Sequence, residues 1–234
     1  MEPIVIFEDE SVLVLDKPAG WIVNEAITTK DRPVLQSFIK KNFNFETSES
    51  KKFRSGIVHR LDKETSGVIL IAKTKKAFTD LQDQFKKRLV EKKYVALLHG
   101  ELKPESGNVE VPLGRLPWNR ERFGVIPGGR ESETRYKVLE YYKKDGEKFS
   151  LTEFYPLTGR THQIRIHAKY LGYPIVSDEF YSGRKTSRND RKWCKRLFLH
   201  AIELKFLNPE TKKEMVVNSS LPEELHEALD YLIK

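Results

Sequence analysis

Cysteine is nearly absent from this chain of 234 residues, in which Cys194 is the only one. A single thiol excludes an internal disulfide and a metal cluster built on several cysteines. Long apolar runs are missing too. The longest, residues 67–72, is typical of a buried strand and is far short of the roughly 20 residues that span a bilayer. The first residues also lack the basic and then apolar pattern of a signal peptide. We therefore expect a cytoplasmic protein that does not enter a membrane.

Acidic residues are in the minority. The chain has 34 Asp and Glu and 42 Lys and Arg, which gives a net charge of +8. Such an excess favours a polyanionic partner, since Lys and Arg displace the counterions condensed on phosphates. Between Arg184 and Arg196 there are seven basic residues and one acidic residue, with Trp193 among them and Tyr181 just before. Two interpretations stay open for this stretch: a solvated loop, or a surface that grips a polyanion.

Internal repeats, low-complexity tracts and long linkers are absent as well, so we predict a single domain over residues 1–234. Alternating or continuous apolar patterns predict strands at residues 4–7, 12–15, 68–72, 94–98, 109–111, 134–142, 149–155 and 198–206. Helical spacing predicts a short helix that begins near Pro33. It also predicts three further helices, over residues 78–89, 161–171 and 222–233. Residues 44–56 and most of 101–129 are expected to form loops. The fold class is therefore α+β, with a mixed, largely antiparallel β-sheet flanked by helices and loops.

A first candidate motif, H-R-L-D-K-E-T-S-G, occupies residues 59–67, directly before the apolar strand. Arg60 and Asp62 are two positions apart, so in extended backbone both point to one side, away from His59 and Leu61. A carboxylate beside a guanidinium stays ionised and oriented at neutral pH. Spacing alone favours a loop salt bridge followed by a Thr-Ser-Gly turn over a catalytic carboxylate.

A second candidate motif, T-G-R-T-H-Q-I-R-I-H, occupies residues 158–167. Its glycine permits a tight turn, and Thr158 or Thr161 is a candidate N-cap for the helix that follows. Helical geometry places His162 and Arg165 on one face. A metal site formed by His162 and His167 is disfavoured, because a spacing of five residues does not align two imidazoles on one helical face.

Both motifs closely resemble signatures of the RluA family of pseudouridine synthases, H-R-L-D-x-x-T-S-G and T-G-R-x-H-Q-I-R-x-H. Further agreement comes from D-K-P-A-G at residues 16–20, K-K-Y-V-A at 92–96 and L-H-A at 199–201, so the resemblance covers nearly the whole chain. Asn24 is a departure, since many relatives carry a histidine there. The resemblance implies the pseudouridine synthase fold with a central catalytic cleft. The N-terminal S4 module of many relatives is not expected, because the matching domain starts almost at residue 1.

The resemblance also implies a reaction without a cofactor. Uridine is isomerised by breaking the N-glycosidic bond, turning the base and joining C5 to C1′, which involves no redox step and no energy source. Asp62 matches the catalytic aspartate of the family, and its attack on C1′ or removal of a proton from C2′ both stay open. Arg165 matches the arginine that pairs with this aspartate. Tyr94 matches the tyrosine that lies against the target base, although a role in core packing is the alternative.

Further residues are expected to bind RNA rather than to react. Arg60 matches the arginine that enters the space of the flipped base, and Leu199 is a candidate for the apolar wall of the pocket. The loop 114–129 is expected to grip RNA, and its neighbourhood holds Arg115, Arg120, Arg122 and Arg130. Arg160 and His162 of the second motif complete the substrate-binding set. We expect His59, Thr65, Ser66 and Gly67 to support the loop that carries Asp62.

The expected partner is a stem-loop of transfer RNA or large-subunit ribosomal RNA, with no DNA, no membrane and no metal, and the protein is expected to be a monomer. Two other classes of protein are the alternatives. A non-catalytic RNA-binding or ribosome-assembly protein on the same scaffold would not need Asp62, Arg165 and Tyr94 together. A nucleoside or glycoside hydrolase would need a second carboxylate to activate water, for which Glu64 is the nearest candidate.

Overall fold

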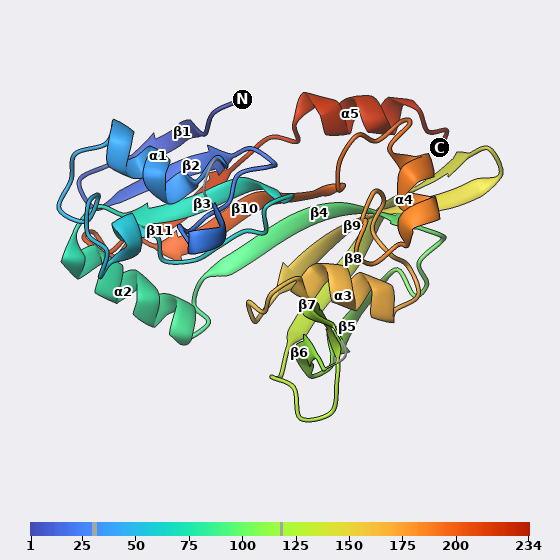
Figure 1. Ribbon diagram of the computed structural model, residues 1–234, viewed down its shortest axis with the longest axis horizontal. Helices are drawn as coiled ribbons and strands as arrows, with labels where there is room; N and C mark the ends of the chain where they lie inside the picture. The colour runs from blue at the N-terminus through green and yellow to red at the C-terminus, as the bar shows by residue number, and fades with distance from the viewer. Residues whose placement is uncertain (30–31, 118) are drawn as a thin grey trace. The chain divides into compact units, whose positions relative to one another are not determined.

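The computed structural model describes residues 1–29, 32–117 and 119–234, with the backbone alone at positions 28, 120 and 121 (Figure 1). The chain divides into two compact units. The first contains Met1–Lys92 and Ala201–Ser220, and the second contains Lys93–His200 and Leu221–Lys234. The single domain expected over residues 1–234 stays a prediction.

The sheet of the first unit has the strand order β1-β2-β3-β10-β11. Its strands are β1 (Ile4–Glu8), β2 (Val12–Lys17), β3 (Ser66–Ala72), β10 (Leu199–Leu207, whose first two residues belong to the second unit) and β11 (Glu214–Asn218). β1 and β2 form the predicted N-terminal hairpin, and β2 pairs antiparallel with β3. β3 is buried along its whole length, which explains its uninterrupted apolar sequence.

The helices of the first unit are α1 (Leu35–Asn42) and α2 (Lys75–Lys86), with 3-10 turns at Ile27–Thr29 and Arg54–Gly56. α2 begins after Thr74, whose hydroxyl oxygen accepts a hydrogen bond from the backbone N–H of Ala77 at 3.0 Å. Phe78 and Leu81 are buried on its inner face. Leu89, which the spacing assigned to the same helix, instead follows its end and is 51% exposed, because Lys87 and Arg88 turn the chain out of the helix.

The sheet of the second unit has the order β4-β9-β8-β5 and is antiparallel at its β4–β9, β9–β8 and β8–β5 pairs. Its strands are β4 (Glu91–His99, whose first two residues belong to the first unit), β5 (Ser106–Glu110), β8 (Glu133–Lys144) and β9 (Glu147–Pro156). β8 and β9 meet at the predicted turn, where Asp145 and Gly146 have positive φ. The helices are α3 (Gln163–Tyr170), α4 (Arg184–Asp190) and α5 (Glu223–Asp230).

The expectation that residues 101–129 form long loops around a short strand at 109–111 is wrong for most of the loops, because much of this stretch forms strands. Besides β5, the strands β6 (Leu113–Leu116) and β7 (Asn119–Val125) form a separate antiparallel hairpin. A Cβ atom on Gly114 would lie 2.5 Å from the side chain of Ile126, and one on Gly124 would lie 2.9 Å from that of Leu116. These glycines therefore make room for aliphatic side chains within the hairpin instead of marking a loop.

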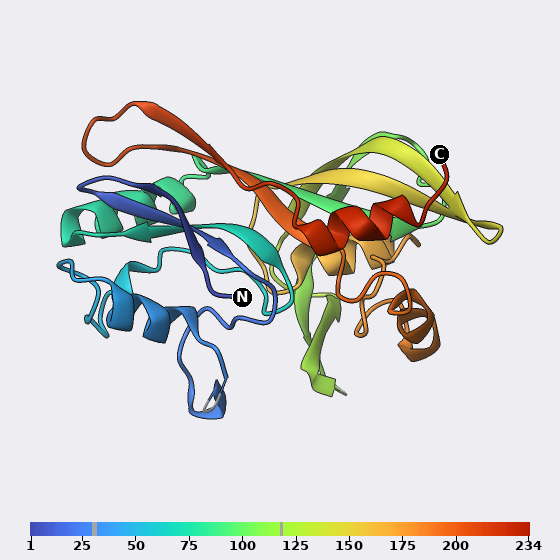
Figure 2. The ribbon, with the colours of Figure 1, turned by 90° about the horizontal axis from the view of Figure 1, so that it is seen from above.

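Each unit has a hydrophobic core of its own. Val14, Leu70 and Phe206 are among the buried residues of the first core, and Leu97, Phe154 and Phe198 among those of the second. Residues 184–190, for which a solvated loop was one interpretation, form α4. Figure 2 shows α3, α4 and the β6–β7 hairpin on the same side of the strands of the second unit. Among the described residues, no helix has the length and apolar character needed to cross a membrane.

Candidate active site

The segment that carries Asp62, residues 59–67, is anchored at its start by His59. The Nε2 atom of this imidazole accepts a hydrogen bond of 2.8 Å from the backbone N–H of Leu70 in β3, and the ring stacks on Phe85 with centroids 5.0 Å apart. Loss of hydration, followed by the positive charge of Lys92, lowers the pKa of His59 to about 3. A neutral His59 thus ties the segment to the strand beside it, in keeping with its expected supporting role.

Gly67 anchors the other end of the segment. Its φ of 116° favours glycine, and a Cβ atom at this position would lie 2.2 Å from the carbonyl oxygen of Ala201 in β10. Any larger residue would push β3 and β10 apart. The conformation of the T-S-G turn therefore depends on the close approach of these two strands.

The middle of the segment is held by Lys17, which is fully buried. Its ammonium group donates to the carbonyl oxygens of Pro18 and Trp21, both at 3.0 Å, and of Lys63 at 3.3 Å. The backbone N–H of Gly20 donates to the same carbonyl of Lys63 at 2.8 Å. The D-K-P-A-G motif thus fixes the backbone next to Asp62.

Asp62 is displayed on this anchored segment with its side chain half-buried. Leu61 is buried and Arg60 is exposed. These two neighbouring residues thus differ in exposure, as expected for an extended backbone. A carboxylate on a fixed backbone is suited to act on a substrate carbon, because little reorganisation is needed before the reaction.

In the second unit, Arg165 of α3 is buried and held by Asp178. Its Nε and Nη2 atoms donate to the two carboxylate oxygens of Asp178, both at 2.8 Å. The Oδ1 atom of Asp178 also accepts from the backbone N–H groups of Phe180 and Tyr181. These two rings lie against the guanidinium, with centroids 5.4 Å and 5.1 Å from its central carbon. Asp178 therefore orients Arg165 and also folds the loop that covers it.

The N-terminal end of α3 is fixed by hydrogen bonds that involve neither predicted threonine as a cap. The N-cap is His162, in a left-handed conformation and without a capping side chain. Thr158 is occupied elsewhere: its hydroxyl oxygen accepts from the backbone N–H of Glu133 and also bonds Gln163. The prediction of a cap by Thr158 or Thr161 is therefore wrong, because Thr158 and Gln163 link the motif to β8 instead.

His162 and Tyr181 connect α3 to the β6–β7 hairpin. The Tyr181 hydroxyl donates to the carbonyl of Phe123 at 3.2 Å and lies 2.9 Å from Nδ1 of His162. A hydroxyl has one hydrogen, so Nδ1 of His162 carries the proton of the second bond. The hairpin, the helix that carries Arg165 and the loop 178–182 thus meet at one hydroxyl group.

His167, at the end of the motif, is a buried residue of the fold. Its Nε2 atom lies 2.8 Å from the hydroxyl of Ser132, which in turn donates to the carbonyl of Val111. Burial lowers the pKa of His167 to about 4, so the ring is neutral at pH 7. Within residues 1–29, 32–117 and 119–234, no group of three His, Cys, Asp or Glu side chains is placed to hold a metal ion.

Most of the other predicted RNA-binding residues gather near Tyr181. Arg115 lies over the ring of Phe123 at 5.2 Å, Arg122 lies over Phe180 at 5.8 Å, and Nε of Arg160 donates to the carbonyl of Glu131. With His162 and the buried Arg165 they form a cationic and aromatic cluster in the second unit. Among the remaining arginines of this region, Arg130 is exposed, whereas the side chain of Arg120 lies outside the described residues.

Tyr94 and Leu199 belong to the second unit as well. Tyr94 is half-buried in β4, opposite Phe154 of β9, and Leu199 is buried in the core. Arg60 and Asp62 lie in the first unit. The expected pairing of Asp62 with Arg165, and the central cleft that would contain it, stay predictions.

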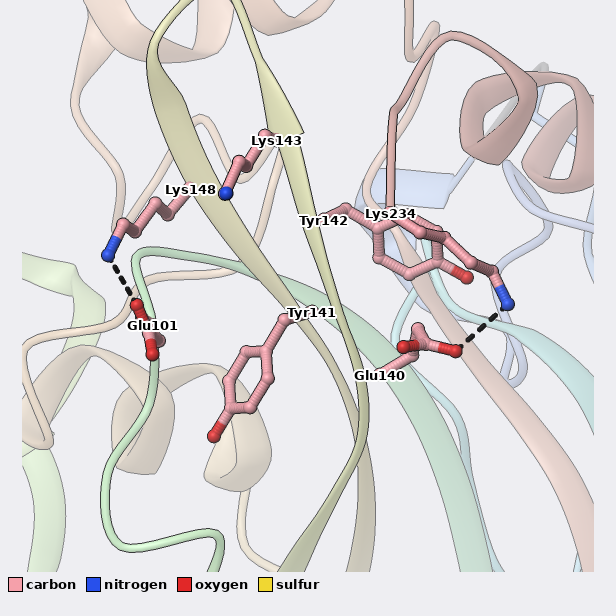
Figure 3. Close-up of a pocket in the computed structure, with 7 residues that line it drawn as sticks. All are labelled: Glu101, Glu140, Tyr141, Tyr142, Lys143, Lys148 and Lys234. Atoms are coloured by element: carbon pink, nitrogen blue, oxygen red, sulfur yellow. Dashed lines mark hydrogen bonds and ion pairs between the residues drawn. The ribbon is translucent and has the colours of Figure 1, made fainter.

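A cavity of about 460 Å³ lies elsewhere in the second unit, along β8 (Figure 3). It is lined by Glu101, Glu140, Tyr141, Tyr142, Lys143, Lys148 and Lys234. Two of these lysines are paired with glutamates, Lys148 with Glu101 at 2.5 Å and Lys234 with Glu140 at 2.9 Å. The lining includes none of the residues predicted for the site, so this cavity is separate from the candidate active site.

The family was decided by comparison with known proteins. The model of a family described as RNA pseudouridylate synthase matches residues 11–170. The chain belongs to this family. The resemblance to the RluA family is thus confirmed, and so is the prediction of an enzyme that forms pseudouridine in RNA rather than a non-catalytic RNA-binding protein.

Relatives of this pseudouridine synthase cover nearly its whole length. It is 35% identical over 233 residues to the ribosomal large subunit pseudouridine synthase C of Vibrio vulnificus, covering 99% of this chain and 70% of the relative. It is 33% identical to an uncharacterized RNA pseudouridine synthase of Bacillus subtilis, covering 100% of this chain and 74% of the relative. The solved structure of human RNA pseudouridylate synthase domain containing 1 is 28% identical with a TM-score of 0.73, covering 94% of this chain and 84% of that one. The predicted fold is confirmed.

Three residues of this pseudouridine synthase that shape the site were missed from the sequence. Asp178 and Phe180 lie 13 and 15 positions beyond Arg165 on a loop, so no periodicity joins them to it. The only available signal was a run of two acidic and two aromatic residues, D-E-F-Y at residues 178–181, shortly before the basic stretch. The role of Lys17 was hidden as well, because nothing in a lysine beside a proline indicates full burial.

Proposed function

We propose that this protein isomerises uridines of large-subunit ribosomal RNA to pseudouridines, with Asp62 as the catalytic carboxylate. The observation that carries the proposal is the position of Asp62, on a segment held by His59, Lys17 and Gly67. The relatives from Vibrio and Pseudomonas aeruginosa named for the ribosomal large subunit support the choice of RNA.

The proposed reaction conserves every atom of the substrate. The bond from N1 of uracil to C1′ breaks, the base turns, C5 bonds to C1′, C5 loses its proton and N1 gains one. Asp62 starts this sequence either by adding to C1′ or by removing the proton of C2′. Arg165 supplies a guanidinium in which Asp178 uses two of the five N–H donors. Arg165 is assigned to the Asp62 carboxylate, and Tyr94 is assigned to the face of the base.

The target nucleotide has to leave its stack before Asp62 can reach the sugar. Unstacking costs a few kcal/mol, which an inserted side chain partly offsets. Arg60 is assigned this role because it is exposed and two residues from Asp62. Arg115, Arg122, Arg160 and His162 are assigned to the RNA around the flipped base, where arginine and aromatic planes stack on unpaired bases. Leu199 is assigned to the wall of the pocket.

The remaining features of the proposal concern the setting of the reaction. We infer a monomer that works in the cytoplasm on a structured stem-loop, without a cofactor. A stem-loop of transfer RNA is the second candidate substrate, because the features assigned to RNA binding recognise folded shape and phosphates and do not separate the two RNAs. Mapping pseudouridines in both RNAs, with and without the gene, distinguishes them.

Two neighbouring carboxylates make a matched test of the mechanism. Asp62→Asn should abolish release of tritium from [5-³H]uridine-labelled RNA, by many orders of magnitude, while RNA affinity and folding change little. Glu64→Gln, two residues away and paired with Lys63 on the surface, should keep nearly full activity. A few per cent of activity in a clean preparation of Asp62→Asn would remove Asp62 from its role. Free uracil in place of pseudouridine would identify a hydrolase instead.

A further inference from the structure

Helix α4 and the turn after it present a strongly cationic surface, in which Arg191 lies 3.8 Å from the exposed Glu179. The exposed residues include Arg184, Lys185, Arg188, Arg191, Lys192 and Lys195. Asp190 is the only acidic residue between Glu179 and Glu203 in the sequence, and it is 3% exposed. The negative charge of the segment is therefore directed inward, and the described face toward solvent carries cations.

Asp190 is turned inward because it anchors the helix. One of its carboxylate oxygens accepts from the backbone N–H of Ser177 at 2.8 Å and lies 3.0 Å from Nε2 of His99. Its backbone carbonyl accepts from Trp193 and Cys194. These contacts fix the helix on the body of the second unit, so the exposed cations project from a defined backbone. Such a surface loses little conformational entropy when it binds a partner.

Helix stability does not explain the position of the first two of these cations. Arg184 and Lys185 stand in the first turn of α4, where the helix dipole repels positive charge, and the first turn holds no acidic residue. The N-cap, Gly183, offers no capping side chain. A local arrangement that weakens its own helix is expected where function requires it.

We propose that the cationic face of α4 binds the phosphate backbone of the RNA stem that flanks the target uridine. This inference rests on the proposed function for the identity of the RNA. Asp190 bonds to Ser177, and the next residue, Asp178, holds Arg165. An RNA stem on α4 is therefore attached to the same short stretch of chain that orients the guanidinium. Figure 2 shows α4 on the side of the strands where the β6–β7 hairpin lies, so both elements can contact one RNA.

The test compares two sets of three charge-neutralising changes. The first variant is Arg184→Gln, Lys185→Gln and Arg188→Gln, all at exposed positions of α4. The control is Lys76→Gln, Lys86→Gln and Lys87→Gln, at exposed positions on and just after α2. A third variant, Arg184→Lys with Arg188→Lys, keeps the charge. Melting curves check the folding of each protein, and affinity for a pre-folded stem-loop is measured from 50 to 300 mM salt.

The α4 variant should bind the stem-loop about tenfold or more weakly at 0.15 M salt, and the slope of log K against log salt should shrink by about 2 to 3, because each phosphate contact contributes roughly 0.7–0.9. The single-turnover rate at saturating RNA should stay within about twofold, since phosphate contacts position the RNA but do not react. The variant with lysines should keep the wild-type slope.

An unchanged slope in the α4 variant, or an equal change in the α2 control, would overturn the proposal. Binding is measured without turnover, so the proposed RNA-binding face of α4 and the proposed function can be refuted independently. A wild type that forms no pseudouridine refutes the proposed function, whereas the loss of slope in the α4 variant still supports an RNA-binding surface.

Discussion

Replacing Asp178 with asparagine should destabilise the fold, because it breaks the buried ion pair between Asp178 and Arg165. Arg165 is 4% exposed and Asp178 is 1% exposed, and they share two hydrogen bonds of 2.8 Å. Breaking a buried ion pair by removing one partner costs about 3–5 kcal/mol. The asparagine oxygen can still accept from the backbone of Phe180 and Tyr181, so the loop itself should keep its shape.

A double variant separates the loss of charge from the loss of packing. On its own, Arg165→Gln should lower the free energy of unfolding by about as much as Asp178→Asn does. Arg165→Gln combined with Asp178→Asn removes both charges of the pair, so its cost should be smaller than the sum of the single costs by on the order of 2–3 kcal/mol.

Urea unfolding at pH 7, followed by circular dichroism, measures all three free energies, provided that the slopes of the transitions agree. If the two single costs simply add in the double variant, the ion pair is not what stabilises this part of the protein, and the reasoning above fails.

Two further predictions concern the first unit. Arg60→Ala should lower the single-turnover rate on a stacked stem-loop far more than it weakens initial binding, and this rate defect should shrink on RNA whose target uridine is already unstacked. Stopped-flow fluorescence of a base analogue at the target position measures both rates. An equal rate defect on both RNAs would make Arg60 a simple phosphate contact. In the folded state the pKa of His59 is lowered from 6.5 to about 3. Between these two pH values the unfolded chain therefore binds a proton at His59 that the folded chain does not bind. The free energy of unfolding should fall as the pH drops from about 6.5 towards 3, by up to about 1.4 kcal/mol per pH unit. His59→Gln can keep the bond to Leu70 without titrating, so an unchanged pH dependence of its urea midpoint would count against this source of acid sensitivity.

The loop that carries Asp62 and the elements next to it could be predicted because the signals there are local. β3 is buried on both faces, so its apolar run has no polar interruption. α2 combines a Thr74 cap with a buried face. The positions of Asp62 and Arg165 followed from two long motifs. The turn between β8 and β9 followed from its Asp-Gly pair.

The elements that were missed depend on contacts distant in sequence. α4 has no apolar periodicity, because its buried residues are Ser187 and Asp190, and a polar pattern of this kind does not separate a helix from a loop. The glycines of the β6–β7 hairpin indicated loop until the cross-strand side chains that cover them were known. The bond from Arg165 to Asp178 joins a helix to an irregular loop, for which sequence spacing gives no rule.

Lys17 can be regarded as a cation bound in a site of carbonyl oxygens. Its ammonium group occupies the kind of position that a sodium or potassium ion takes when it is ligated by backbone carbonyls, here those of Pro18, Trp21 and Lys63. An ion in such a site exchanges with the solution, but this cation is covalently attached to β2 and cannot dissociate. The backbone beside Asp62 therefore keeps this support in any salt. Because the amine is fully buried, Lys17 should also be protected from amine-reactive reagents for as long as the loop remains folded.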